Sequence, residues 1–115
     1  MNGARTLAMM VLTTLALLPV IGNGVRRNPD NKKTAAEIFD KSCSSCHGKD
    51  GRAKTFKAKF NHARNLADSE WQGNVSDERI FNSISNGKGK MPAFGKKLSD
   101  EQVNSLVTYV RSLKK

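Results

Sequence analysis

The hydrophobic residues in the middle and C-terminal parts of the chain recur at helical rather than strand spacing. The first such stretch begins at Thr34, which forms with Glu37 the pattern of a capping box. Its apolar positions are Ile38, Phe39 and Cys43. The pattern predicts a first helix that runs from Thr34 to about Cys46.

Two later helices have equally clear start signals. Ser76 is expected to cap one helix, because acidic residues follow it in the first turn, and Gly87 is expected to end it. Its buried stripe should be Ile80, Phe81 and Ile84. Ser99 and Gln102 form a second capping box. The inner face of this last helix should be Val103, Leu106, Val107, Val110 and Leu113. The predicted fold class is all-α.

The segments between these helices have weaker patterns. Residues 48–66 show no sustained period, so we expect a long loop, which is unusual in a small domain unless it serves a site. Residues 68–72 are expected to form a short helical turn around Trp71. Residues 87–92 are expected to form a second loop, rich in glycine and closed by Pro92.

Residues 1–24 have the pattern of a secretory signal, since Arg5 precedes an apolar run and small residues follow it. The run is shorter than the roughly 20 residues that a spanning helix needs, so we expect cleavage after Gly24. Residues 25–33 form a polar, basic linker, and residues 34–115 form one domain. The predicted location is the periplasm, with membrane contact only if the signal segment is retained.

Both cysteines of the chain lie in one C-x-x-C-H motif at residues 43–47. This is the spacing that covalent attachment of a c-type haem requires. Thiols at i and i+3 lie on one side of a helix, so Cys43 and Cys46 can both add to vinyl groups along one porphyrin edge. The adjacent His47 can then reach the iron. The motif predicts one haem c, bound through Cys43 and Cys46.

Two other interpretations of the cysteine pair are weaker. A thioredoxin-like dithiol needs a preceding strand and a β-α-β context, and the sequence upstream of Cys43 has no strand pattern. A zinc site would use Cys43, Cys46 and either His47 or His62. Adjacent residues point apart on a helix, however, so Cys46 and His47 are poorly placed to bind one small ion.

The domain is small, so its polypeptide alone would bury only a marginal hydrophobic core. A buried porphyrin with two covalent tethers adds apolar area, as disulfides or zinc do in other small domains. We therefore expect the protein to be largely unfolded without its haem.

These features together resemble the class I c-type cytochromes, over about residues 34–113. The resemblance rests on C-x-x-C-H in an N-terminal helix, a methionine loop before the last helix and an aromatic residue in that helix. In that family an aromatic residue four positions before the first cysteine packs on the C-terminal helix. Phe39 and Tyr109 stand at these positions, and Ala35 stands where many members have glycine. The resemblance implies N- and C-terminal helices that cross around one haem wrapped by long loops.

The resemblance also implies His47 as the proximal iron ligand and a methionine sulfur as the distal ligand. Met91 is the methionine that remains outside the signal segment. Pro92 follows it and restricts it to an extended conformation. His62, in the basic loop, is the rival distal ligand.

Three further side chains are candidates for contacts with the haem. Trp71 is expected to lie beside the ring and to donate its indole N–H to a haem propionate, as an aromatic residue does in similar proteins. Arg64 or Arg52 is expected to pair with the same carboxylates.

A haem with protein ligands at both axial positions leaves no coordination site for a substrate, and a thioether ligand raises the reduction potential. We therefore expect a one-electron carrier rather than an enzyme. The alternative is a haem enzyme or sensor in which Met91 dissociates. The resemblance implies that its partners are redox proteins: a quinol-oxidising complex or dehydrogenase as donor and an oxidase or reductase as acceptor.

The net charge of +10 bears on the choice of partner. Its positive residues cluster in the two loops, at Arg52, Lys54, Lys57, Lys59 and Arg64 and at Lys88, Lys90, Lys96 and Lys97. This pattern predicts a monomer that docks on acidic surfaces of redox partners. Nucleic acid, the general partner of small basic proteins, is not expected for an exported chain.

Overall fold

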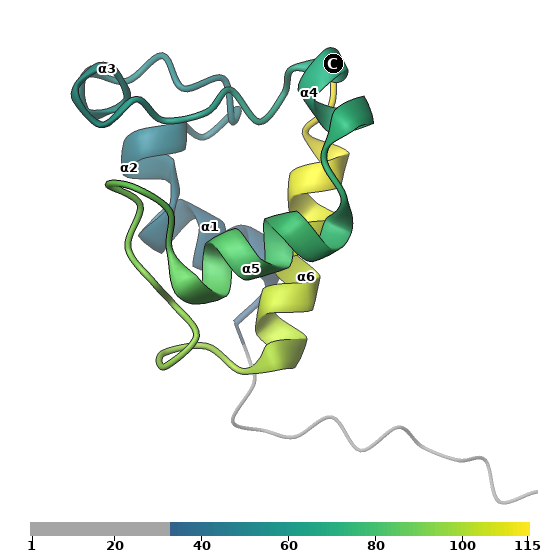
Figure 1. The fold of residues 1–115 in the computed structure, drawn as a ribbon. Coiled ribbons are helices and arrows are strands. Elements are labelled where there is room, and N and C mark those ends of the chain that lie inside the picture. Colours follow the sequence, from purple (N-terminus) through teal and green to yellow (C-terminus); the bar gives the residue numbers. More distant parts are fainter. Residues whose placement is uncertain (1–32) are drawn as a thin grey trace, which may run out of the picture.

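The computed structural model describes residues 33–115, and the predicted signal and nearly all of the linker lie outside this range. Figure 1 shows the helices of the described part in sequence order. They are α1 (Ala35–Ser42), α2 (Ser44–His47), α3 (Phe56–Asn61), α4 (Ser69–Asn74), α5 (Asp77–Asn86) and α6 (Asp100–Ser112). Residues 33–115 contain no β-strand, which confirms the all-α class. None of these helices is long and apolar enough to cross a membrane.

The helix starts predicted from capping signals are confirmed. At α1, the Thr34 hydroxyl accepts a hydrogen bond from the Glu37 N–H, and the Glu37 carboxylate accepts one from the Thr34 N–H at 2.8 Å. At α6, Ser99 and Gln102 form the same reciprocal pair. Ser76 caps α5, and Gly87 ends it. Such caps satisfy N–H groups that have no partner within the helix.

The first helix does not run unbroken to Cys46 as predicted. It is interrupted at Cys43, whose φ of −117° departs from the helical value although its ψ of −35° does not. The Cys43 carbonyl still accepts hydrogen bonds from the N–H groups of Cys46 and His47, so a short second helix, α2, starts directly. The bend therefore falls within the C-x-x-C-H motif itself.

The prediction of an unstructured loop over residues 48–66 is also wrong. The segment contains α3, which Thr55 caps by accepting a hydrogen bond from the Ala58 N–H at 3.0 Å. The same hydroxyl donates to the Cys46 carbonyl at 3.0 Å. α3 is stabilised by packing against α2, a tertiary contact that sequence periodicity does not reveal.

The short turn around Trp71 is confirmed and extended. α4 covers residues 69–74, and the Asp68 side chain caps it by accepting the Trp71 N–H at 2.8 Å. Gln72 is buried, and its amide donates to the Leu66 and Val110 carbonyls at 2.8 Å each. This side chain therefore ties α4 to the last helix.

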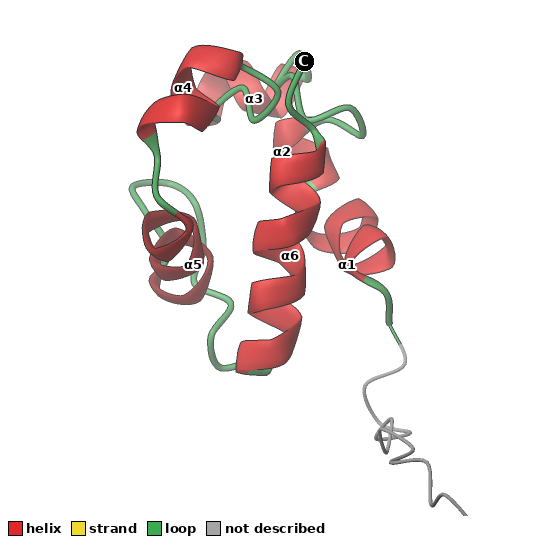
Figure 2. Ribbon diagram, turned by 90° about the vertical axis from the view of Figure 1, so that its right-hand side faces the viewer, coloured by secondary structure: helices red, strands yellow, loops and turns green. Residues whose placement is uncertain are grey.

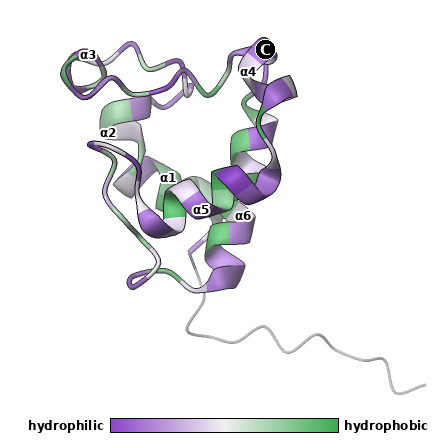
Figure 3. Cartoon of the chain, in the orientation of Figure 1, coloured by the Kyte–Doolittle hydropathy of each residue, from purple (hydrophilic) through white to green (hydrophobic). Residues whose placement is uncertain are grey.

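The hydrophobic core lies where α1 and α5 pack against α6. Figure 2 shows α6 between α1 and α5. The rings of Phe39 and Tyr109 meet at the α1–α6 crossing with centroids 5.0 Å apart, as the family resemblance implied. In Figure 3, α5 and α6 alternate between hydrophobic and hydrophilic colours, as expected of helices with one buried face. Two predicted core residues, Phe81 and Leu113, are only partly buried.

Candidate cofactor site

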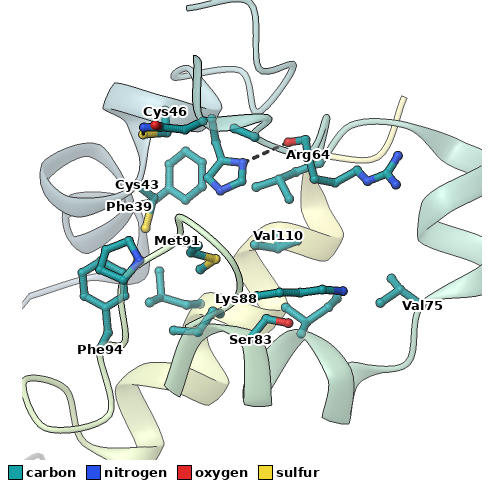
Figure 4. Close-up of a pocket in the computed structure, with 18 of the residues that line it drawn as sticks. Phe39, Cys43, Cys46, Arg64, Val75, Ser83, Lys88, Met91, Phe94 and Val110 are labelled. Carbon is teal, nitrogen blue, oxygen red and sulfur yellow. Dashed lines mark hydrogen bonds between the residues drawn. The ribbon is translucent and has the colours of Figure 1, made fainter. Parts of the chain in front are cut away.

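A cavity of about 510 Å³ lies between α2 and the loop after α3 on one side and α5 and the loop after it on the other. Figure 4 shows its lining side chains. The volume falls within the range of roughly 300–1,000 Å³ that is usual for sites of small organic ligands and cofactors. Six residues of the hydrophobic core also line this cavity: Phe39, Leu66, Ile80, Ile84, Leu106 and Val110. An apolar group bound here would extend the core.

His47 lines the cavity from α2. Its Nδ1 lies 2.9 Å from the Arg64 carbonyl oxygen, the contact that Figure 4 marks with a dashed line. A carbonyl only accepts, so Nδ1 carries the proton and Nε2 keeps a free lone pair. Burial lowers the pKa of His47, while the bond to Arg64 opposes that shift. The ring is therefore held in the neutral tautomer that binds a metal through Nε2.

Cys43 and Cys46 both line the cavity as free, partly buried thiols. Burial raises the pKa of Cys43 to about 11, and the nearby Cys46 adds to the shift. Cys43 is thus a neutral thiol at pH 7. The Asn61 amide lies 3.7 Å from the Cys46 sulfur and donates to it.

Met91 lies in the cavity on the loop that follows α5 (Figure 4). Its N–H donates to the Lys88 carbonyl at 2.9 Å, and its carbonyl accepts from the Lys88 N–H at 3.1 Å. Gly87 has a φ of +75°, and a Cβ there would lie 2.6 Å from the Met91 carbonyl oxygen. A side chain at this position would therefore push the Met91 loop out of place.

The structure brings most of the other predicted residues to the same cavity. Trp71, Arg64 and Pro92 line it, and so does His62, whose φ of 53° ends α3 in a left-handed conformation. Arg52 does not line it and instead lies beside the Asp50 carboxylate at 4.0 Å. Arg52 is therefore the one predicted contact residue that the described structure keeps outside the cavity.

The sequence interpretation missed several residues at the rim. Asn61 contacts Cys46, and Arg79 lines the cavity from α5. Lys90, which the sequence placed in the basic cluster beside Met91, lines the cavity as well, and its bond to the Phe60 carbonyl at 2.8 Å joins the Met91 loop to α3. A Thr55 cap before Phe56 was the signal that could have revealed α3 and hence the position of Asn61. Arg79 has no comparable signal, because charged residues are common at any surface.

The lining has a clear charge pattern. Among the described residues that line the cavity, the charged ones are all basic: Arg64, Arg79, Lys88 and Lys90. An apolar floor with a basic rim suits a flat apolar group that carries carboxylates on one edge.

Comparison with known proteins identifies the family. Residues 30–110 match the family model described as cytochrome c oxidase, cbb3-type, subunit III. The chain belongs to this family of c-type cytochromes. It is 35% identical over 82 residues to the cbb3-type cytochrome c oxidase subunit FixP of Azorhizobium caulinodans, an alignment that covers 70% of this chain and 27% of FixP. The chain therefore spans about a quarter of the length of that relative.

Smaller relatives match over more of their length. Cytochrome c6 of Leptolyngbya boryana is 36% identical over 76 residues, which cover 64% of this cytochrome and 82% of the relative. The solved c-type cytochrome KustC0563 superposes with a TM-score of 0.67 at 38% identity, over 72% of this chain and 100% of that chain. The class I cytochrome c fold and the resemblance to this family are thereby confirmed.

The family is one of c-type cytochromes, and it implies a haem c for this chain. The residues present fit the group that the family implies. The cavity combines thiols, an imidazole with a free Nε2, a thioether, an apolar floor and a basic rim, which matches the chemistry of a porphyrin with two propionates.

Proposed function

We propose that this cytochrome is a periplasmic one-electron carrier with a single haem attached through Cys43 and Cys46, and with His47 and Met91 as its iron ligands. One observation supports the proposal above all others. The cavity that contains the C-x-x-C-H side chains from the start of the domain also contains the sulfur-bearing side chain of Met91, from the loop before the last helix. When bound, the haem supplies one-electron oxidation and reduction.

The role of His47 follows from its hydrogen bond. The Arg64 carbonyl fixes the proton on Nδ1 and sets the orientation of the ring. Nε2 is then available as a donor to iron without first losing a proton. Because the accepting group belongs to the backbone, substitution of the Arg64 side chain leaves this bond in place.

The Met91 loop supports the carrier over the alternative of an enzyme or sensor. An open distal position would need Met91 to leave, yet the loop is held by paired hydrogen bonds between Lys88 and Met91. The bond from Lys90 to Phe60 holds the same loop to the opposite side of the cavity. A thioether held in this way would bind the iron of a bound haem and would leave no open coordination site for a substrate.

The rims of the cavity indicate the kind of partner. Residues 51–67 and 79–99 border the site and contain no acidic residue. Their lysines and arginines attract a partner whose docking surface is acidic, and they speed the encounter at low salt. Export to the periplasm is supported by the signal pattern of residues 1–24, which lies outside the described residues.

The experiment is to express the full chain in a host that matures c-type cytochromes, and to examine the cell fractions. We expect haem that stays with the polypeptide in a denaturing gel, a low-spin absorption spectrum and recovery in the periplasmic fraction. A high-spin ferric spectrum would favour the enzyme or sensor instead. Haem that separates on the gel would contradict attachment through both cysteines.

A further inference from the structure

The two most exposed large hydrophobic side chains in residues 33–115 lie next to each other. Phe56 is 76% exposed and Phe60 is 61% exposed. They stand one turn apart on α3, and their ring centroids are 4.8 Å apart with the planes tilted by 59°. Single exposed hydrophobic residues are common at surfaces, but two exposed aromatic rings in contact form an apolar patch that calls for an explanation.

The two phenylalanines lie on α3, and hydrogen bonds fix this helix in place. Thr55 caps α3 and bonds to the Cys46 carbonyl, while Ala58 on the opposite face is buried. Neither Phe56 nor Phe60 lines the cofactor cavity. The two rings therefore face outward, and a group bound in the cavity would not cover them.

The patch borders the cofactor site. Residues 61–64, which follow Phe60 directly, line the cavity, and Asn61 contacts the Cys46 sulfur. Lys90 reaches from the Met91 loop to the Phe60 carbonyl. A protein seated on the two rings would thus lie beside the edge of the cavity, where electron transfer over a short distance is favoured.

The patch is surrounded by positive charge. Lys54, Lys57 and Lys59 are exposed on α3 and just before it, and Lys90 is exposed beside Phe60. Residues 51–67 contain no acid that would neutralise them. An apolar centre within a charged rim is the usual arrangement of a protein interface.

We propose that the Phe56–Phe60 pair is the apolar centre at which this cytochrome docks its redox partner, a protein with a small apolar patch ringed by carboxylates. The inference rests on the proposed carrier function and specifies its docking surface. Lysines around the pair raise the rate of encounter, and burial of the two rings prolongs the complex.

Two other occupants fit less well. A second copy of the chain would bring its own lysines against these lysines, and like charges at an interface oppose association. A lipid surface is usually bound by a longer helix with a full apolar face, whereas α3 spans six residues and exposes two rings.

The test uses the full holoprotein and washed membranes of the organism that encodes it, which contain the native redox complexes. Electron transfer is measured against cytochrome concentration for wild type, for Phe56→Gln/Phe60→Gln and for Phe56→Leu/Phe60→Leu. We expect the glutamine pair to raise the half-saturating concentration roughly tenfold, because it removes apolar area from the contact. The leucine pair should keep most of the affinity. An unchanged absorption spectrum checks that each variant is folded.

Charge variants distinguish the contribution of the surrounding lysines from that of the two aromatic rings. Lys57→Glu/Lys59→Glu should slow electron transfer most at low salt, whereas the glutamine pair should weaken it about equally at low and high salt. Lys41→Glu, on the exposed end of α1, is a control for charge reversal outside α3 and should behave as wild type.

Four results would overturn the inference. If wild type is active and the glutamine pair has the same kinetics, Phe56 and Phe60 take no part in docking. The proposed carrier function would then still stand. Binding of wild type, but not the glutamine pair, to phosphatidylglycerol vesicles would assign the patch to a lipid surface. A wild-type dimer that the glutamine pair abolishes in sedimentation would assign it to self-association. Wild type inactive with the membranes would overturn the carrier function, and the docking surface with it.

Discussion

The α1–α6 crossing and the two loop segments around the cavity are built in different ways. At the crossing, Phe39, Val103 and Leu106 are at most 2% exposed, and both helices begin with capping boxes. The loop segments, residues 48–66 and 87–98, present many exposed lysines and rest on isolated hydrogen bonds, such as Leu66 to Gly51 at 2.7 Å.

The difference indicates that the crossing stabilises the domain and that the loop segments form the site. The crossing is stabilised by apolar side chains of the chain itself. The loop segments place the Met91 side chain, positive charge and an aromatic patch around a cavity whose floor is part of the same core. A substitution in the crossing should therefore reduce stability throughout the domain, whereas one in a loop should mainly affect the site.

The largest effect should follow removal of both attachment points. We expect Cys43→Ala/Cys46→Ala to carry no covalent haem and to be largely unfolded, because the cofactor contributes much of the core in so small a domain. Circular dichroism and a denaturing gel stained for haem measure the two effects. A double variant that folds as tightly as wild type without haem would show that the crossing is sufficient by itself.

The next largest effect on stability should follow a substitution at the α1–α6 crossing. Phe39→Ala removes a ring that is 2% exposed and packs on Tyr109, and we expect it to reduce the free energy of unfolding by about 3–5 kcal/mol. Denaturant titration of the holoprotein measures the loss. The matched control is Phe56→Ala, an exposed aromatic residue whose removal should change stability by about 0.5 kcal/mol or less. Equal losses for the two variants would contradict the division between crossing and loops.

A smaller and more local effect is expected at Gly87. An alanine Cβ there would meet the Met91 carbonyl oxygen, and the positive φ adds strain, together costing about 1–3 kcal/mol. Since the clash falls on the Met91 loop, the absorption spectrum of the haem should change more than the melting temperature. Gly89→Ala is the control, because it has a similar positive φ with open space around the added Cβ. Matching spectra for both variants would show that the clash at Gly87 has no influence on the site.

The sequence predicted the crossing better than the loops, for a physical reason. The capping boxes at Thr34 and Ser99 and the apolar periods behind them are local signals, and both helices begin where they were expected, although the first is interrupted at Cys43. The Phe39–Tyr109 contact was implied by the family resemblance rather than by periodicity.

The loops depend on contacts between distant residues, and this explains what was missed. α3 is stabilised by packing on α2, and the Lys90–Phe60 bond joins residues far apart in the chain. The hydrophobic spacing stays helical across Cys43, so it does not predict the break in the backbone there. The motif residues Cys43, Cys46 and His47 were predicted from their spacing alone, and all three line the cavity.

The central claim is that Met91, and not His62, is the distal iron ligand. Replacing each of the two residues tests it most directly. The reduction potential and the ferric absorption spectrum should be measured for wild type, Met91→Ala and His62→Ala in the full holoprotein. We expect Met91→Ala to lose the wild-type low-spin spectrum and to have a lower potential, because a thioether ligand favours the ferrous state. His62→Ala should match wild type in both. The opposite pattern, with Met91→Ala unchanged and His62→Ala altered, would make His62 the distal ligand and contradict the proposed carrier.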